Sequence, residues 1–212
     1  MDILGVPVAI WHSLIVEEPT GISVFVVLVL AARVLTDILT RGKPPSDRVE
    51  RIRQASDDIS YAGSLAAVFF LILSGITGFL IQPYSSLIAQ PILVNIAFLA
   101  LGALFFWSAF FVLRFVSGPQ LWSHRSLYFL AVLTAVLALL FDALAASVGA
   151  ELSLGQSALQ PLYDALNFSW RTFTIQPIEI GITLTLVIIG IAVALFALFR
   201  ERVTGDASTH AP

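Results

Sequence analysis

Five long apolar stretches dominate the pattern of hydrophobic and polar positions along this chain. A helix needs roughly 20 mostly apolar residues to cross the hydrocarbon core of a bilayer, and each stretch has about that length. The five predicted spans are Gly21–Leu39, Tyr61–Ile81, Pro91–Leu113, Leu127–Val148 and Pro177–Phe199. The pattern therefore predicts an all-α integral membrane bundle of five transmembrane helices.

Two shorter segments complete the expected architecture. Residues 3–16 are apolar but too short to span, so we expect an N-terminal interfacial segment there. After the fourth span, Leu159, Leu162, Tyr163 and Leu166 have the i, i+3, i+4, i+7 spacing of an amphipathic helix. We expect this helix to lie flat on the outer surface of the membrane.

The basic residues predict the orientation of these spans. Ten of the 11 lie in or beside regions that an odd number of helices places on one face, namely Arg33, Arg41, Lys43, Arg48, Arg51, Arg53, Arg114, Arg125, Arg200 and Arg202. Only Arg171 falls on the other face. Because basic residues collect on the cytoplasmic side, we expect an outside N-terminus and an inside C-terminus in the cytoplasmic membrane. Residues 1–202 would form one transmembrane domain and 203–212 a flexible cytoplasmic tail.

Composition supports a lipid-facing surface and narrows the chemistry. The chain is 58% hydrophobic and 12% charged, with a mean hydropathy of +0.93, whereas soluble domains carry about 25% charged residues. It has no cysteine, which excludes disulfides and thiolate ligands. The net charge of −3 argues against a nucleic-acid partner. Lipids and other integral membrane subunits are the partners that we expect.

Asp142 is the one acidic residue well inside a predicted span. It lies about 9 Å from the outer end at the helical rise, where a carboxylate should face the bundle. Ala145 and Gly149 give its face small residues, and the second span carries Ser74 and Thr77 among glycines. We expect a polar contact between the second and fourth spans. It is either an interhelical hydrogen bond or a small-molecule, quinone or proton site.

A histidine and two glutamates precede the first predicted span. Glu17 and Glu18 stand directly before Pro19, where negative charge favours a helix N-terminus and proline suits the first turn. We therefore expect the glutamates to cap the first helix, which leaves His12 as an interfacial anchor or the rim of a pocket. His12, Glu17 and Asp142 together form the candidate cofactor-binding cluster near the outer face. No residues are assigned as catalytic or metal-binding.

The stretch "HSLIVEEP", residues 12–19, resembles the opening of an uncharacterised bacterial and archaeal family of four-helix membrane proteins. That family begins its first helix with His-Pro-Leu-x-Val-His-Phe-Pro. The stretches "LSGITGFL", "QPILVN" and "VGAEL" are similar to its later landmarks. The resemblance implies haem binding or a respiratory accessory role. The chain departs from the pattern at Glu17 and Gln90, where the family has histidines, and in its fifth predicted span.

The histidines themselves allow a direct test of haem binding. A bis-histidine haem needs two histidines at similar depth on facing helices. His12 precedes the first span, His124 lies in an inner loop and His210 lies in the tail. We therefore predict no cofactor for this chain alone. Haem b or a quinone would need ligands from partner subunits.

These observations favour a non-catalytic integral membrane subunit of a larger membrane complex, of respiratory or other redox type. Such a subunit would contribute scaffold and helix packing and would not be an enzyme by itself. A quinone- or haem-associated electron-transfer subunit with a site near the outer face is one alternative. A small transporter or channel is another, although the chain has no clear inverted repeat.

Overall fold

The computed structural model describes residues 2–3, 6–41, 46–82, 85, 89–155, 157, 159–169 and 185. A two-stranded antiparallel ribbon, β1 (Asp2–Ile3) and β2 (Val6–Pro7), leads into the helices. Four long helices follow: α1 (Val8–Leu39), α2 (Asp47–Ile81), α4 (Pro91–Ser117) and α5 (Arg125–Leu154). A 3-10 turn, η1 (Gly118–Trp122), joins α4 to α5, and a short helix, α6 (Gln160–Ala165), comes last.

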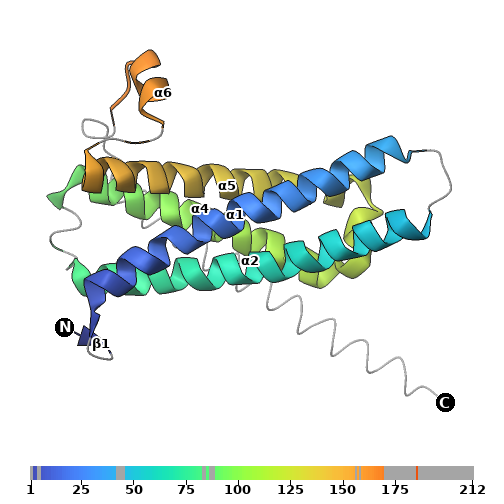
Figure 1. Ribbon diagram of the computed structural model, residues 1–212, viewed down its shortest axis with the longest axis horizontal. Coiled ribbons are helices and arrows are strands. Elements are labelled where there is room, and N and C mark those ends of the chain that lie inside the picture. The colour runs from blue at the N-terminus through green and yellow to red at the C-terminus, as the bar shows by residue number, and fades with distance from the viewer. Residues whose placement is uncertain are drawn as a thin grey trace.

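The four long helices form an up-down-up-down bundle (Figure 1). Contacts run from α1 to α2, from α2 to α4, from α4 to α5 and from α5 back to α1. Helices α2 and α5 therefore lie diagonally across the bundle. The fully buried core includes Val26, Ala67, Ala103, Trp107 and Phe110, and large apolar side chains such as Phe25, Phe69 and Phe129 point outward.

All four long helices are long and apolar enough to cross a membrane. This confirms an all-α, membrane-embedded, multi-pass chain. The first four predicted spans coincide with these helices, and three of the predicted boundaries, at Leu39, Ile81 and Pro91, agree with the structure. The fifth predicted span, Pro177–Phe199, lies outside the described residues apart from position 185.

The N-terminal expectation was wrong. Residues 8–16 are not a separate interfacial segment, because α1 begins at Val8 and runs without interruption to Leu39. Glu17 and Glu18 therefore do not cap a helix, and their side chains are exposed along it. Pro19 lies inside the helix, where it is buried. Because several residues before Gly21 are polar, hydropathy did not locate the true start of this helix, which lies 13 positions earlier in the sequence.

Helix α2 also starts earlier than hydropathy predicts. Ser46 caps it by accepting a hydrogen bond from the Val49 amide at 3.4 Å, as its position before the charged segment suggests. The 35 residues of α2 span about 52 Å, which exceeds the roughly 30 Å hydrocarbon core. The first turns of α2 therefore carry its charged residues beyond the apolar layer.

Helix α6 packs on the end of α5 opposite to the α1–α2 connection. The Tyr163 hydroxyl and the Ser147 hydroxyl lie 2.8 Å apart, and Tyr163 packs in a cluster with Leu99 and Val148. Leu162 and Leu166 are exposed instead. Of the four predicted apolar positions, Leu159 and Tyr163 thus pack on the bundle end, and Leu162 and Leu166 do not. Gly155, with a positive φ of 74°, ends α5 before this turn.

Gly63 shows how closely α1 and α2 approach each other. A Cβ atom at this position would overlap the Cγ2 atom of Val26, whereas Gly75 on the same helix has open space around it. We expect Gly63→Ala to lower stability by about 1 kcal/mol, because overpacking costs about 1–3 kcal/mol and loss of a helical glycine returns about 1 kcal/mol. Gly75→Ala should be neutral or stabilising. Thermal midpoints of the two purified variants in detergent test this packing, and equal midpoints would contradict it.

Candidate functional site

Asp142 is the centre of a buried hydrogen-bond network that joins three helices. Its Oδ2 atom accepts a hydrogen bond from the Ser23 hydroxyl on α1 at 2.6 Å. Ser23 in turn accepts one from the indole N–H of Trp107 on α4 at 2.8 Å. Thr20 on α1 donates to the other carboxylate oxygen over a longer 3.4 Å. We call Thr20, Ser23, Trp107 and Asp142 the Asp142 network.

The burial of Asp142 was expected, but its partner was not. Asp142 is 4% exposed, and Ser23 and Trp107 are completely buried. The sequence suggested Ser74 or Thr77 of the second span as partners, and this was wrong because α2 lies diagonally across from α5. Helices α1 and α4 flank α5 and supply the partners. The carboxylate thus satisfies polar groups between helices, as a buried polar group in a membrane bundle must.

His12 lies at the opposite end from the α1–α2 connection and contacts α2. Its Nδ1 atom is 2.9 Å from the Thr77 hydroxyl. That hydroxyl shares its one proton between the carbonyls of Leu73 and Ser74, so we infer that Nδ1 donates to Thr77. A Cβ at Gly78 would lie 3.3 Å from the His12 ring, so glycine here admits the imidazole.

Partial burial lowers the pKa of His12, which precedes the candidate span Ile15–Leu39. Its ring is therefore neutral near pH 7, with the proton on Nδ1. In this state the ring is a hydrogen-bond donor that pins α1 to α2, and its Nε2 atom carries a lone pair.

The three candidate cofactor ligands do not bond to one another. His12 bonds to Thr77, Asp142 bonds to Ser23 and Thr20, and Glu17 is exposed. His124 stands before α5 at the other end of the bundle, and His210 lies outside the described residues. Within the part of the chain that the structure describes, no group of three or more His, Asp or Glu residues is placed to hold a metal ion.

A second buried cluster, which sequence reasoning missed, lies near the α1–α2 end. Asp57 on α2 accepts hydrogen bonds from the guanidinium of Arg114 on α4, through Nε at 2.6 Å and through Nη2. The indole N–H of Trp122 in η1 donates to the same carboxylate at 2.6 Å. The side chains of Asp57 and Arg114 are 10% and 15% exposed. This bidentate pair fixes α4 and η1 onto α2.

Arg33 extends this cluster to α1. Its guanidinium lies over the Trp122 ring at 4.3 Å and donates to the carbonyl of Arg53 at 2.7 Å. Its Nε is 3.8 Å from Asp37, which stands four positions later on the same helix. Asp37 also accepts from Arg53 at 2.8 Å and, more weakly, from the Tyr128 hydroxyl at 3.3 Å. The Asp57 cluster is the set Arg33, Asp37, Arg53, Asp57, Arg114, Trp122 and Tyr128.

Two sequence signals could have pointed to this cluster. Arg114 is the one charged residue of helix α4, and Asp57 stands one turn before the second predicted span. Gly118, which has a positive φ of 53°, ends α4 and starts the turn that brings Trp122 to Asp57. The pairing itself could not be deduced, because it depends on which helices are neighbours.

The chain matches no family model and is not detectably similar to any curated protein or solved structure.

Proposed function

We propose that this chain is a non-catalytic integral membrane subunit of a larger membrane complex, to which it contributes scaffold and helix packing. One observation carries the proposal. Two acidic groups that are buried between the helices, Asp142 and Asp57, are each engaged by donors from other elements of the same chain.

Such engagement is what a packing role requires. Within a bilayer, polar side chains form hydrogen bonds between helices because lipid offers them no hydrogen-bond partners. The Asp142 network joins α1, α4 and α5, and the Asp57 cluster joins α1, α2, α4, η1 and α5. Together they join every long helix to at least one other helix of the bundle.

A respiratory or other redox complex is the first host to test, since the resemblance noted for residues 12–19 points there. A second candidate function has a specific observation in its favour. Asp142 is a carboxylate buried within a candidate span, and such residues commonly mark proton or ligand pathways. In that case the chain would be a quinone- or haem-associated electron-transfer subunit, with the missing ligands supplied by partners.

The state of the chain in native membranes tests the proposal. A tagged full-length chain should migrate, after extraction in mild detergent, well above its 22.9 kDa mass and together with other integral membrane subunits. Any redox spectrum should belong to those subunits. A single-component 22.9 kDa species with its own cofactor absorbance would contradict the proposal.

We further propose five spans with the N-terminus outside and the C-terminus in the cytoplasm, as the basic residues predict. The chain has no cysteine, so single cysteines report their location cleanly. Ser153→Cys, at an exposed position near the end of α5, should react with an impermeant maleimide in intact cells. Ser46→Cys and Ser208→Cys should react only after permeabilisation. Labelling of Ser46→Cys in intact cells would contradict the proposed orientation. Labelling of Ser208→Cys in intact cells, without labelling of Ser46→Cys, would contradict the fifth span.

A further inference from the structure

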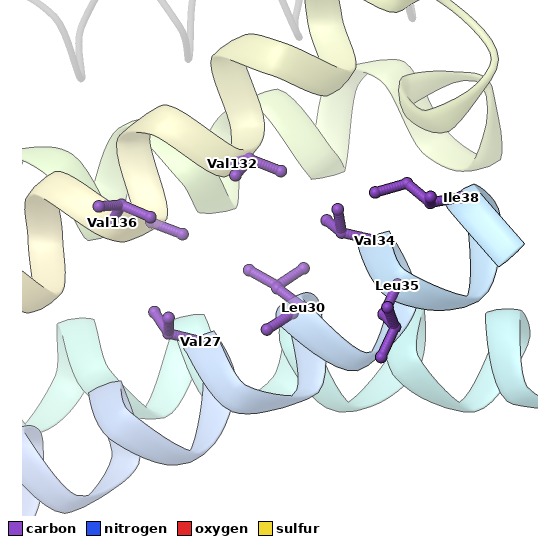
Figure 2. Close-up of a pocket in the computed structure, with 9 residues that line it drawn as sticks. Val27, Leu30, Val34, Leu35, Ile38, Val132 and Val136 are labelled. Carbon is purple, nitrogen blue, oxygen red and sulfur yellow. The ribbon is translucent and has the colours of Figure 1, made fainter.

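An aliphatic groove of about 300 Å³ runs between α1 and α5 on the outside of the bundle (Figure 2). Val132 and Val136 of α5 face Leu30 and Val34 of α1 across it. The remaining lining residues are also aliphatic: Val27, Ala31, Leu35, Ile38 and Ala135. This volume is at the lower end of the range for small-molecule sites, about 300–1,000 Å³, and suits one slender apolar chain.

The length and position of the groove match one leaflet of a bilayer. Its lining on α1 extends from Val27 to Ile38, which is about 16 Å at the helical rise. Half of a roughly 30 Å hydrocarbon core is about 15 Å. Ile38 stands next to the last residue of α1, so the groove opens where the helix leaves the apolar layer.

Two exposed arginines stand at that opening. Arg41 follows the end of α1, seven positions after Val34, and Arg125 begins α5, seven positions before Val132. Seven positions are about two helical turns, so Arg125 lies on the same stripe of α5 as Val132, and Arg41 lies in the turn that directly follows α1. Neither arginine forms an ion pair with a described residue.

The helix ends are held together beside the opening. Tyr128 on α5 donates a hydrogen bond to Asp37 on α1 at 3.3 Å, and the carboxylate of Asp37 is also engaged by Arg53. The nearby acid is thus occupied within the chain, which leaves the positive charge of Arg41 and Arg125 available to an anion.

We propose that this groove binds one anionic phospholipid, with an acyl chain against the valines and the phosphate between Arg41 and Arg125. The aliphatic lining suits an acyl chain, and the length of the groove matches one leaflet. The two arginines suit a negatively charged head group. The site would give the subunit a fixed lipid in the leaflet at the α1–α2 end. This inference does not depend on the proposed function.

Native mass spectrometry of the purified full-length chain tests the head-group contact. The probes are phosphatidylglycerol and phosphatidylcholine with identical acyl chains. The chain should retain one phosphatidylglycerol in preference to phosphatidylcholine. The double variant Arg41→Gln, Arg125→Gln should bind phosphatidylglycerol about 25-fold more weakly, at roughly a factor of five per arginine. A matched control, Arg48→Gln with Arg51→Gln on the exposed face of α2, removes the same charge and should keep the preference.

Filling the groove tests the acyl-chain contact separately. Ala31→Phe places a ring in the groove and should reduce retention of both lipids, whereas Ala62→Phe, at an exposed position on α2, should not. Three results would overturn the proposal. They are an equal loss of phosphatidylglycerol in the Arg48, Arg51 control, unchanged lipid retention in Ala31→Phe, and retention of a second copy of the chain that Ala31→Phe displaces.

Discussion

Asp57→Asn should lower the free energy of unfolding by about 3–5 kcal/mol, the largest effect that we expect from a single substitution. The neutral amide leaves the guanidinium of Arg114 without its counter-charge at a site where the Arg114 side chain is only 15% exposed. Removing one partner of a buried ion pair costs this much because the other charge stays buried. The new Asn side chain still offers an acceptor to the Trp122 indole, so the loss reports the ion pair itself.

The measurement is the thermal midpoint of the purified chain in detergent. A loss of this size corresponds to a fall of about 10 °C for a chain of this length. Asp58→Asn is the matched control, since Asp58 is the exposed neighbour on the same helix, and it should leave the midpoint nearly unchanged. Adding Arg114→Gln to Asp57→Asn should recover part of the loss, because a neutral amide pair replaces the isolated charge. A midpoint for Asp57→Asn close to that of Asp58→Asn would show that the pair is not a structural element.

Asp142→Leu should destabilise the bundle by about 2 kcal/mol. The substitution removes the acceptor of Ser23 and Thr20 and crowds the contact between α5 and α1. Buried polar groups that lose their partners cost about 1–3 kcal/mol, although hydrogen bonds between membrane helices are worth about 0.6 kcal/mol on average. Asp142→Asn keeps an acceptor and should cost less than about 1 kcal/mol.

A control for this second prediction compares serines on the two candidate partner helices, α1 and α2. Ser23→Ala should reproduce much of the Asp142→Leu loss, because it removes a donor to Asp142 and the acceptor of the Trp107 indole. Ser74→Ala, on the helix that the sequence suggested, should have little effect. Thermal midpoints of all four variants decide the matter. A greater loss for Ser74→Ala than for Ser23→Ala would contradict the packing of α5 against α1.

Hydropathy located the four helices because burial in lipid requires a long apolar run whatever the helix packs against. It could not locate the polar ends of those helices. Residues 8–20 of α1 contain His12, Glu17 and Glu18, and the first turns of α2 contain most of its charge. Backbone hydrogen bonding continues through these residues although their hydropathy falls.

The candidate site was predictable in part for a related reason. Asp142 stands out because charge within a span is costly, and its burial followed from that alone. Its partner did not follow. A membrane helix is apolar on its lipid face as well as on its protein face, so periodicity says little about which neighbour each side meets. The 57-residue separation of Asp57 and Arg114 and the 119-residue separation of Ser23 and Asp142 depend on bundle order, which local sequence does not encode.

The scaffold role is tested most directly by the Asp142→Asn variant of the full chain, with assembly and turnover measured in the same preparation. The variant and the unaltered chain would be purified by tag from native membranes, and the complex that accompanies each would be sized and assayed. If Asp142 serves packing, the variant should enter the same complex, and that complex should turn over at the same rate. A complex of normal size and amount that has lost its turnover would contradict the account, and would assign Asp142 to proton or ligand transfer instead.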